Sequence, residues 1–308
     1  MSLVPGGEIL AEANRQGRAV GAFNFNNLEF LQAIVAAADE AHTPVFLATS
    51  EGAVKYAGLE YIVALARAAA ARTSVPLCLH LDHGQDLALI RRCIEAGYTS
   101  VMIDASRLPF AENVAVTRQV VETARPRGVS VEAELGRLVG VEDNVSVAER
   151  DAVLVNPEEA RDFVEKTGVD SLAPAVGTSH GAFKFKGEPR LDFDRLSKVK
   201  ELTRGLPLVL HGASSVPADV LARCERFGVA VKGARGVPEA DLARAVRLGV
   251  NKINVDTDLR LAFVAEVRRV FVEQPAEFDP RHYLGPARDA VKELVGRKIR
   301  LFRHGAEG

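Results

Sequence analysis

Three histidines lie far apart in the sequence, yet each follows a short apolar segment and stands near a glycine. His83 belongs to LCLHLDHG, His180 to PAVGTSHG and His211 to LVLHGASS. If these segments are strands of one barrel, the three imidazoles converge at its mouth. They would then give a divalent metal three nitrogen ligands and leave one position open for substrate. The wide spacing excludes the short ligand runs of a zinc finger.

Carboxylates accompany these histidines. Asp82 directly precedes His83, and an acid beside a metal ligand suits an enzyme that polarises a carbonyl and moves a proton nearby. Glu132 and Glu134 share one face of an expected strand because side chains alternate along a strand, and one of them can reach the mouth. Two simpler interpretations remain open: Asp82 caps a helix beside packed histidines, and the two glutamates face solvent.

Small residues follow two of the expected strands, in Gly177–Gly181 and His211–Ser215. Their backbone amides can approach an anion closely, and serine hydroxyls add donors. The loops after the seventh and eighth strands of a barrel often bind phosphate. Near the last strand, Asn254 and Asp256 share one face, while Thr257 or Asp258 is expected to cap the following helix.

Eight strand-like segments alternate with helical patterns of apolar residues spaced three and four apart, which predicts a (β/α)₈ barrel of the α/β class. The expected strands span residues 20–25, 45–48, 77–81, 100–103, 129–134, 171–174, 208–210 and 252–255. A doubly wound sheet would carry a glycine-rich turn after its first strand, and none stands there. We expect one domain over residues 1–308, long loops after strands five and six (136–151 and 177–190), another long stretch at 228–238, and an extra C-terminal helix over 286–302.

Composition agrees with a soluble globular protein. The chain has 308 residues, a formal charge of −2 and a hydrophobic fraction of 47%. Basic and acidic residues are interleaved, which argues against a nucleic-acid partner. No apolar run is long enough to span a bilayer and no signal peptide begins the sequence. Three widely spaced cysteines predict reduced thiols and a cytoplasmic protein.

The combined motifs resemble the class II, metal-dependent fructose-1,6-bisphosphate aldolases over nearly the whole chain. AFNFNNLE, TSEGAVKYAG, HLDHG, VEAELG, GTSHG, HGASS and KINVDTD occur in that family's order. The resemblance implies metal ligation by His83, His180 and His211, with Glu134 near the metal and Asp104 holding it in an alternative position. It implies Asp82 as the acid/base for the C4 hydroxyl and Glu142 as the base for the triose carbon, although RLVGVEDN departs from the family's usual glycine-rich run around Glu142.

The resemblance also implies a set of substrate-binding residues. Those expected to hold the triose phosphate or to close over it are Gly181, Lys184, Gly212, Ser214, Asp256 and Thr257. Those expected to contact other substrate oxygens or the second phosphate are Ser50, Asn254 and Arg260.

The implied function is reversible cleavage of fructose 1,6-bisphosphate into dihydroxyacetone phosphate and glyceraldehyde 3-phosphate, with a divalent metal stabilising the enediolate. The metal is expected to be Zn²⁺, with Co²⁺ as the alternative, and a monovalent cation can lie near the triose phosphate. The partners expected are a phosphosugar and further copies of the chain, as a homo-dimer or homo-tetramer.

The sequence bears on four alternative functions. Cleavage of tagatose 1,6-bisphosphate would use the same motifs. A barrel metallohydrolase would carry a His-x-His pair after the first strand, which Phe23-Asn24-Phe25 lacks. A non-catalytic phosphosugar-binding protein would need neither Asp82 nor Glu142. A Schiff-base aldolase would need a lysine at the mouth end of a strand, whereas Lys252 stands at the opposite end.

Overall fold

The computed structural model describes residues 3–137, 139–142, 145–147, 153–180 and 191–304. Residues 139–142, 145–147, 179–180 and 304 are described by their backbone alone. Within these ranges, no helix is both long and apolar enough to cross a membrane.

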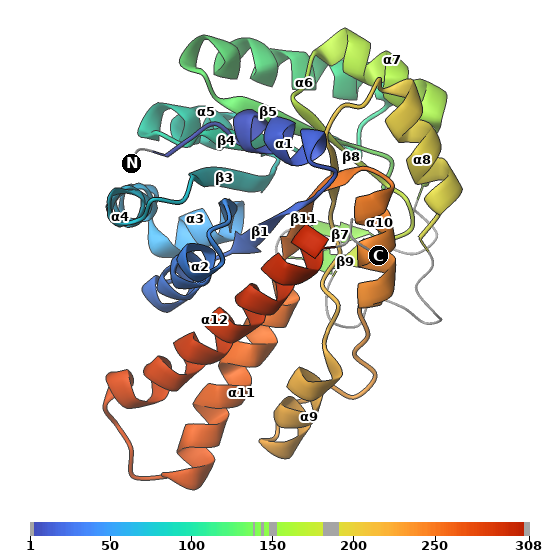
Figure 1. The fold of residues 1–308 in the computed structure, drawn as a ribbon. Helices are drawn as coiled ribbons and strands as arrows, with labels where there is room; N and C mark the ends of the chain where they lie inside the picture. The colour runs from blue at the N-terminus through green and yellow to red at the C-terminus, as the bar shows by residue number, and fades with distance from the viewer. Residues whose placement is uncertain (1–2, 138, 143–144, 148–152, 181–190, 305–308) are drawn as a thin grey trace.

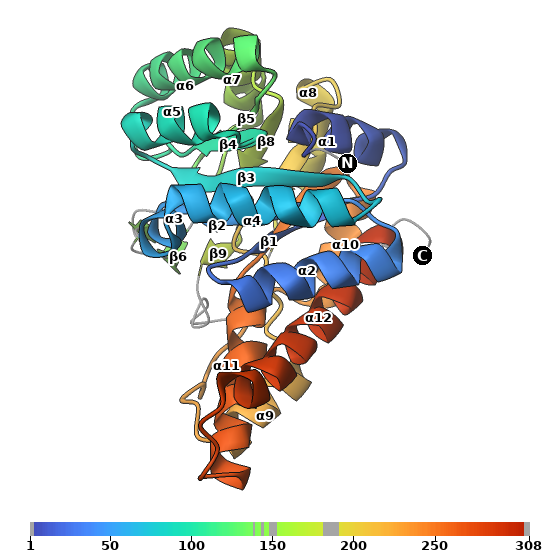
Figure 2. The same cartoon turned by 90° about the vertical axis from the view of Figure 1, so that its left-hand side faces the viewer.

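Eight parallel strands close into a barrel in the order β1-β11-β10-β8-β5-β4-β3-β2, which confirms the predicted fold class (Figures 1 and 2). The barrel strands are β1 (Val20–Asn24), β2 (Val45–Ser50), β3 (Leu77–Gly84), β4 (Ser100–Ile103), β5 (Ser130–Leu135), β8 (Ser171–Pro174), β10 (Leu208–Leu210) and β11 (Val250–Val255).

Most strands lie within two residues of their predicted bounds, and β3 is the exception. It was expected to end at Leu81, but it continues to Gly84, so the HLDHG motif is itself part of the strand. Ser50 of β2 pairs with Asp82 of β3. Asp82 is therefore held by the pairing of β2 with β3.

Helices surround the barrel and connect its strands. Their bounds are α1 (Gly6–Arg15), α2 (Leu28–Ala41), α3 (Glu51–Ala57), α4 (Leu59–Arg72), α5 (Leu87–Ala96), α6 (Phe110–Ala124), the 3₁₀ helix η1 (Arg125–Arg127), α7 (Pro157–Thr167), α8 (Phe193–Leu202), α9 (Ala218–Arg226), α10 (Glu239–Arg247), α11 (Thr257–Glu273) and α12 (Pro280–His304).

Local sequence explains where several helices begin and end. The side chains of Asn27, Asp86 and Asn156 accept backbone N–H groups of the first turns of α2, α5 and α7, which satisfies donors that a helix start leaves without intrahelical partners. Gly97 and Gly168 end α5 and α7 in the left-handed conformation that glycine adopts without steric cost. Since Asp86 caps α5, the interpretation of Asp82 as a helix cap is wrong.

The connections after β5 and β8 were expected to be loops, but they contain a second, smaller sheet. Strands β7 (Val145–Val147), β6 (Val139–Glu142) and β9 (Ser179–His180) lie in the order β7-β6-β9. The pair β6–β9 is parallel and aligns Gly140 with His180. The two long connections at the barrel mouth are therefore joined by backbone pairing.

Two further helical elements differ from expectation. Helix α1 was not predicted, because its apolar residues Ile9, Leu10 and Ala13 form only a short stripe; they pack against Val20 and Phe46 of the barrel. The C-terminal helix begins at Pro280, so Pro286 lies inside α12 and does not start it. Proline suits the first turn of a helix, and Pro280 occupies that place. Helices α11 and α12 extend together away from the barrel (Figures 1 and 2).

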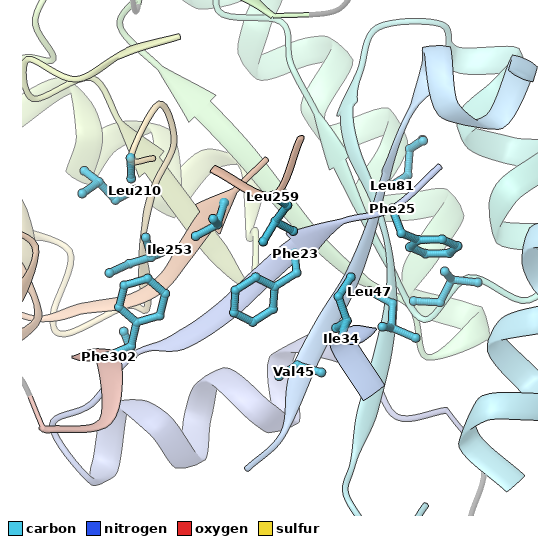
Figure 3. Packing of buried hydrophobic residues seen from close by; sticks show 14 of the residues in the cluster. Phe23, Phe25, Ile34, Val45, Leu47, Leu81, Leu210, Ile253, Leu259 and Phe302 are labelled. Carbon is cyan, nitrogen blue, oxygen red and sulfur yellow. The ribbon is translucent and has the colours of Figure 1, made fainter. Parts of the chain in front are cut away.

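The outer face of the barrel is apolar. Phe23, Leu47, Leu81 and Ile253 belong to the main buried cluster, and Figure 3 shows them with Ile34 of α2 and Leu259 of α11. Because side chains alternate along each strand, the residues between them point into the barrel. Some of these, such as Val20 and Phe46, are apolar and pack against α1, and the polar ones include the candidate site.

Candidate metal centre at the barrel mouth

The backbone of β3 changes direction at His83. Alternation would place His83 on the same outer face as Leu79 and Leu81. The pairing between β3 and β4 shifts between Leu81 and Gly84, and His83 has a positive φ of 48°. A left-handed conformation is unfavourable for a residue with a Cβ and often marks a functional position. It turns the His83 ring toward the same centre as its neighbour Asp82.

The His83 ring meets two carboxylates from neighbouring strands. Its Nδ1 lies 3.0 Å from Asp104 Oδ2 and 3.9 Å from Glu134 Oε2. One candidate ligand atom from each of His83, Asp104 and Glu134 lies within 4.8 Å of the other two, and all three residues are buried. Nitrogen and oxygen donors at this spacing can hold a divalent cation.

A second such group shares His83 with the opposite side of the mouth. Ligand atoms of Asp82, His83 and His211 also lie within 4.8 Å of one another. The rings of His83 and His211 are 4.4 Å apart at an interplanar angle of 60°, and His211 Nδ1 lies 3.8 Å from Asp82 Oδ1. The convergence predicted for these two histidines is therefore present.

Two amides hold the Asp82 carboxylate in place. Asn24 Nδ2 donates to Oδ2 at 2.9 Å, and Asn254 Nδ2 donates to Oδ1 at 2.8 Å. Burial alone would raise the pKa of Asp82, but nearby positive charge, chiefly that of His83 and Lys252, outweighs burial and lowers the pKa. Asp82 is thus kept as an oriented carboxylate able to accept a proton.

The charge state of the cluster fits a cation. Burial and the neighbouring Asp104 raise the pKa of Glu134 well above its usual value. Burial opposes the imidazolium form of His83, yet Asp82, Asp104 and Glu134 together raise the pKa of His83 well above its usual value. Glu134 Oε2 is buried without a hydrogen bond among the described residues. A divalent cation would take over the role that the proton on His83 plays in balancing these carboxylates.

One functional residue escaped the sequence interpretation. The motifs assign no role to Glu132, whereas its Oε1 lies 2.7 Å from His211 Nε2. Its other oxygen accepts from Lys252 Nζ at 2.8 Å. The pattern Glu-x-Glu could have revealed this contact. Two carboxylates on the inward face of one strand lie one below the other, so Glu132 lies deeper in the barrel than Glu134. Lys252 is fully buried in the barrel interior, and Glu132 links it to His211.

Residues expected to bind substrate lie around this centre. Ser50 ends β2, where its Oγ accepts the N–H of Ala53 at 3.2 Å. Gly212 has a positive φ of 58°, and Ser214 Oγ accepts the N–H of Asp256 at 3.4 Å. The loop after β10 is thereby joined to the start of α11, where Thr257 is the first helical residue.

Asp256 and Arg260 form an ion pair, with Arg260 Nε donating to Asp256 Oδ1 at 2.7 Å. Arg260 lines a hollow that is formed by segments following β1, β2 and β11. Its other lining residues are Asn26, Asn27, Phe30, Gly52, Ala53 and Tyr56. The Arg260 guanidinium therefore lies at the rim of the mouth, paired with Asp256.

Neither Thr257 nor Asp258 caps α11, although one of them was expected to do so: Thr257 is already helical, and the Asp258 carboxylate binds elsewhere. Its carboxylate accepts the N–H groups of Ser215 at 3.0 Å and Val216 at 2.8 Å. Lys298 of α12 lies 3.2 Å from the same carboxylate. Helix α12 and Asp258 together fix the shape of the loop after β10.

Four predicted site residues cannot be placed by their side chains. Glu142 lies on β6 and His180 on β9, and only the backbone of these strands is described. Gly181 and Lys184 lie outside the described residues. The neighbouring alignment of β6 with β9 brings the segments that carry Glu142 and His180 together.

A family model for "Fructose-bisphosphate aldolase class-II" matches residues 4–306. The chain belongs to this family. It is 53% identical over 301 residues to the fructose-bisphosphate aldolase of Helicobacter pylori, with 97% of this chain and 98% of that protein covered. It is 52% identical over 303 residues to the fructose-bisphosphate aldolase of Thermus caldophilus, with 97% and 98% covered.

Solved structures agree with this assignment. The crystal structure of the YdjI aldolase from Escherichia coli K12 superposes with a TM-score of 0.80 at 32% identity and covers 97% of each chain. The chain is thus a class II aldolase, a lyase on a TIM barrel. Its family is metal-dependent, and the clusters around His83 supply donors for a metal.

Proposed function

We propose that this class II aldolase reversibly cleaves fructose 1,6-bisphosphate into dihydroxyacetone phosphate and glyceraldehyde 3-phosphate. One observation carries the proposal: two imidazoles from β3 and from the end of β10 meet at the mouth beside a carboxylate oriented by two amides. The names of the relatives at 53% and 52% identity support this substrate.

The metal is proposed to be Zn²⁺, with Co²⁺ as the alternative. His83 and His211 would hold it together with His180, and Asp104 and Glu134 would hold it in an alternative position next to His83. A divalent cation at this place supplies a Lewis acid that polarises the ketone of the sugar. Nitrogen and carboxylate donors suit both metals, so the donor set alone does not choose between them.

Asp82 is proposed to move the proton of the C4 hydroxyl. Asn24 and Asn254 each donate one hydrogen bond to its carboxylate, so its orientation is set before substrate binds. A fixed general base of this kind contributes roughly 10²–10⁴-fold to a rate. Glu142 is proposed to take the proton from the triose carbon, with the short sheet β7-β6-β9 holding its segment near the mouth.

The phosphates are proposed to bind on either side of this centre. The triose phosphate would lie on the backbone of the loop after β10, where Gly212 leaves room for close approach. The other proposed contacts of this phosphate are Ser214, Thr257, Gly181 and Lys184, with a monovalent cation nearby. The second phosphate would meet Arg260, and Ser50, Asn254 and Asp256 would contact or enclose the substrate.

We also propose that residues 1–308 form one domain, that the enzyme acts in the cytoplasm, and that it assembles as a homo-dimer or homo-tetramer. The described cysteines Cys78, Cys93 and Cys224 are all free and buried, which agrees with a reducing compartment.

The test compares cleavage of fructose 1,6-bisphosphate and tagatose 1,6-bisphosphate by the purified protein, before and after chelation. We expect faster turnover of the fructose sugar, complete loss with chelator, and recovery when Zn²⁺ or Co²⁺ is restored. Borohydride added with substrate should not inactivate the enzyme. Faster cleavage of tagatose 1,6-bisphosphate would reassign the substrate, and activity that survives full chelation would refute the metal mechanism.

A further inference from the structure

A row of buried polar side chains crosses the barrel interior below the metal centre. Glu132 of β5 joins His211 above it to Lys252 of β11, at 2.7 Å and 2.8 Å. Lys252 Nζ lies 3.2 Å from His80 Nε2 of β3, and His80 Nδ1 lies 2.8 Å from Ser100 Oγ of β4. We call these four residues, Glu132, Lys252, His80 and Ser100, the interior row.

Every member of the interior row is buried, and the side chain of Lys252 is fully so. TIM-barrel interiors are usually filled by branched apolar side chains. A buried ion pair contributes little net stability compared with apolar residues of similar volume. The presence of an ammonium and a carboxylate here therefore calls for a role other than stability.

The chemistry of lysine fixes the direction of each hydrogen bond. An ammonium group only donates, so Glu132 Oε2 and His80 Nε2 both accept from Lys252. His80 must then carry its proton on Nδ1, which donates to Ser100 Oγ. Since the Glu132 carboxylate also only accepts, His211 carries its proton on Nε2 and donates it to Glu132 Oε1.

That assignment decides which nitrogen of His211 can bind a metal. With the proton on Nε2, the lone pair lies on Nδ1, the nitrogen that faces Asp82 at the mouth. We propose that Glu132 and Lys252 are positioning residues that hold His211 in the tautomer needed for metal binding through Nδ1. This inference rests on the proposed metal site and adds two residues of the barrel interior to it. Carboxylates that orient metal-binding imidazoles in this way commonly affect metal affinity 10–100-fold.

The substitution Glu132→Gln separates orientation from simple burial. The glutamine oxygen must face Lys252, because the ammonium can only donate, so the glutamine NH₂ faces His211 Nε2. His211 then has to accept at Nε2 and carry its proton on Nδ1, where the proton blocks the metal. We expect a loss of Co²⁺ affinity of about 10–100-fold.

The double variant Glu132→Gln/Lys252→Met supplies the decisive comparison. Without the ammonium, the amide can rotate and present its oxygen to the Nε2–H of His211. We expect the double variant to bind Co²⁺ more tightly than Glu132→Gln alone, although it carries one more substitution. Ser100→Ala is the matched control, since it removes a buried partner from the same row but lies four contacts away from His211. Its Co²⁺ affinity should stay within about twofold of wild type.

Co²⁺ affinity is measured by competition with a chromophoric chelator, on full-length variants whose folding is checked by circular dichroism. Long-range ¹H–¹⁵N NMR of the metal-free protein reports the tautomer of His211 directly. We expect the Nε2–H form in the wild type and the Nδ1–H form in Glu132→Gln.

Three results would overturn the inference: wild-type Co²⁺ affinity in Glu132→Gln, a double variant that binds as weakly as Glu132→Gln, or an Nδ1–H tautomer in the metal-free wild type. These results differ from failure of the proposed function, in which the wild type binds Co²⁺ and shows the Nε2–H tautomer but does not cleave the bisphosphate.

Discussion

The outer and inner faces of the barrel are made by alternate residues of the same strands, yet their chemistry differs. The outer face is apolar, whereas the inner face carries charged and hydrogen-bonding side chains beside apolar ones such as Phe46. On β3, Leu79 and Leu81 belong to the apolar cluster under the helices, while His80 and Asp82 take part in hydrogen bonds across the interior. On β11, Ile253 and Lys252 show the same division.

This division separates two tasks that many proteins combine in one core. Burying a large apolar side chain contributes about 1.5–3 kcal/mol to folding, so the outer face can stabilise the barrel. Charged groups inside gain little or nothing once their desolvation is counted. The polar side chains of the interior can therefore serve to orient metal ligands. Inward substitutions should lower activity or metal affinity, whereas outward substitutions should lower stability.

The largest effect is expected from an inward ligand. His211→Ala removes one imidazole from the centre and should lower kcat/KM by at least about 10³-fold, the scale of a lost metal-activated step. Steady-state cleavage of fructose 1,6-bisphosphate, with metal content measured on the same sample, checks this. A folded His211→Ala variant that keeps its metal and its activity would remove His211 from the ligand set.

A second inward substitution addresses the acid/base. Asp82→Asn keeps the size of the side chain but removes its ability to take a proton, so kcat should fall roughly 10²–10⁴-fold while metal content stays near wild type. Rapid-quench measurement of cleavage in a single turnover isolates the chemical step. An unchanged single-turnover rate would show that another group moves this proton.

An outward substitution should do the reverse. Leu47 is fully buried between β2 and the surrounding helices, so Leu47→Ala should lower the free energy of unfolding by about 2–5 kcal/mol. Metal affinity and kcat per folded molecule should be unchanged. Leu47→Met, which conserves volume, serves as the control and should cost less than about 1.5 kcal/mol. Urea unfolding measures the change in stability, and activity assays measure kcat per folded molecule. A drop in kcat per folded molecule would show that the outer face also affects catalysis.

The smallest effect concerns pH. The carboxylates around His83 raise its pKa above the unfolded value of 6.5, so protonated His83 stabilises the metal-free protein below about pH 6.5, and this contribution is lost as pH rises through the folded pKa. A metal needs the neutral ring and must displace that proton. The increase in Tm caused by Co²⁺ should therefore be larger at pH 8 than at pH 6. Scanning calorimetry at both pH values tests this, and an equal increase would contradict it.

The barrel strands were predictable from sequence, because each is a short apolar segment that stands between two helical patterns. The bounds of β4, β8 and β10 were predicted without error. The small sheet β7-β6-β9 was missed because its short strands gain their pairing only when two distant connections meet. Such tertiary pairing leaves no periodic signal in either segment.

The site divides in the same manner. The proximity of Asp82 and His211 could be predicted, because each lies at the carboxyl end of an expected barrel strand. Glu132 and Lys252 could not, since their roles come from contacts across the barrel between residues 120 apart in the sequence. The left-handed backbone of His83 was equally hidden, as nothing in HLDHG alone states that alternation breaks there.

That kink has a consequence for anyone who would transplant this centre into another protein. On a regular strand, adjacent side chains diverge by half a revolution, so a copied Asp-His pair would send one member outward into the helical layer. A successful transplant has to reproduce the positive φ of the histidine and the hydrogen bonds that hold the neighbouring aspartate. Catalytic design on such barrels thus begins with a backbone defect and adds side chains afterwards.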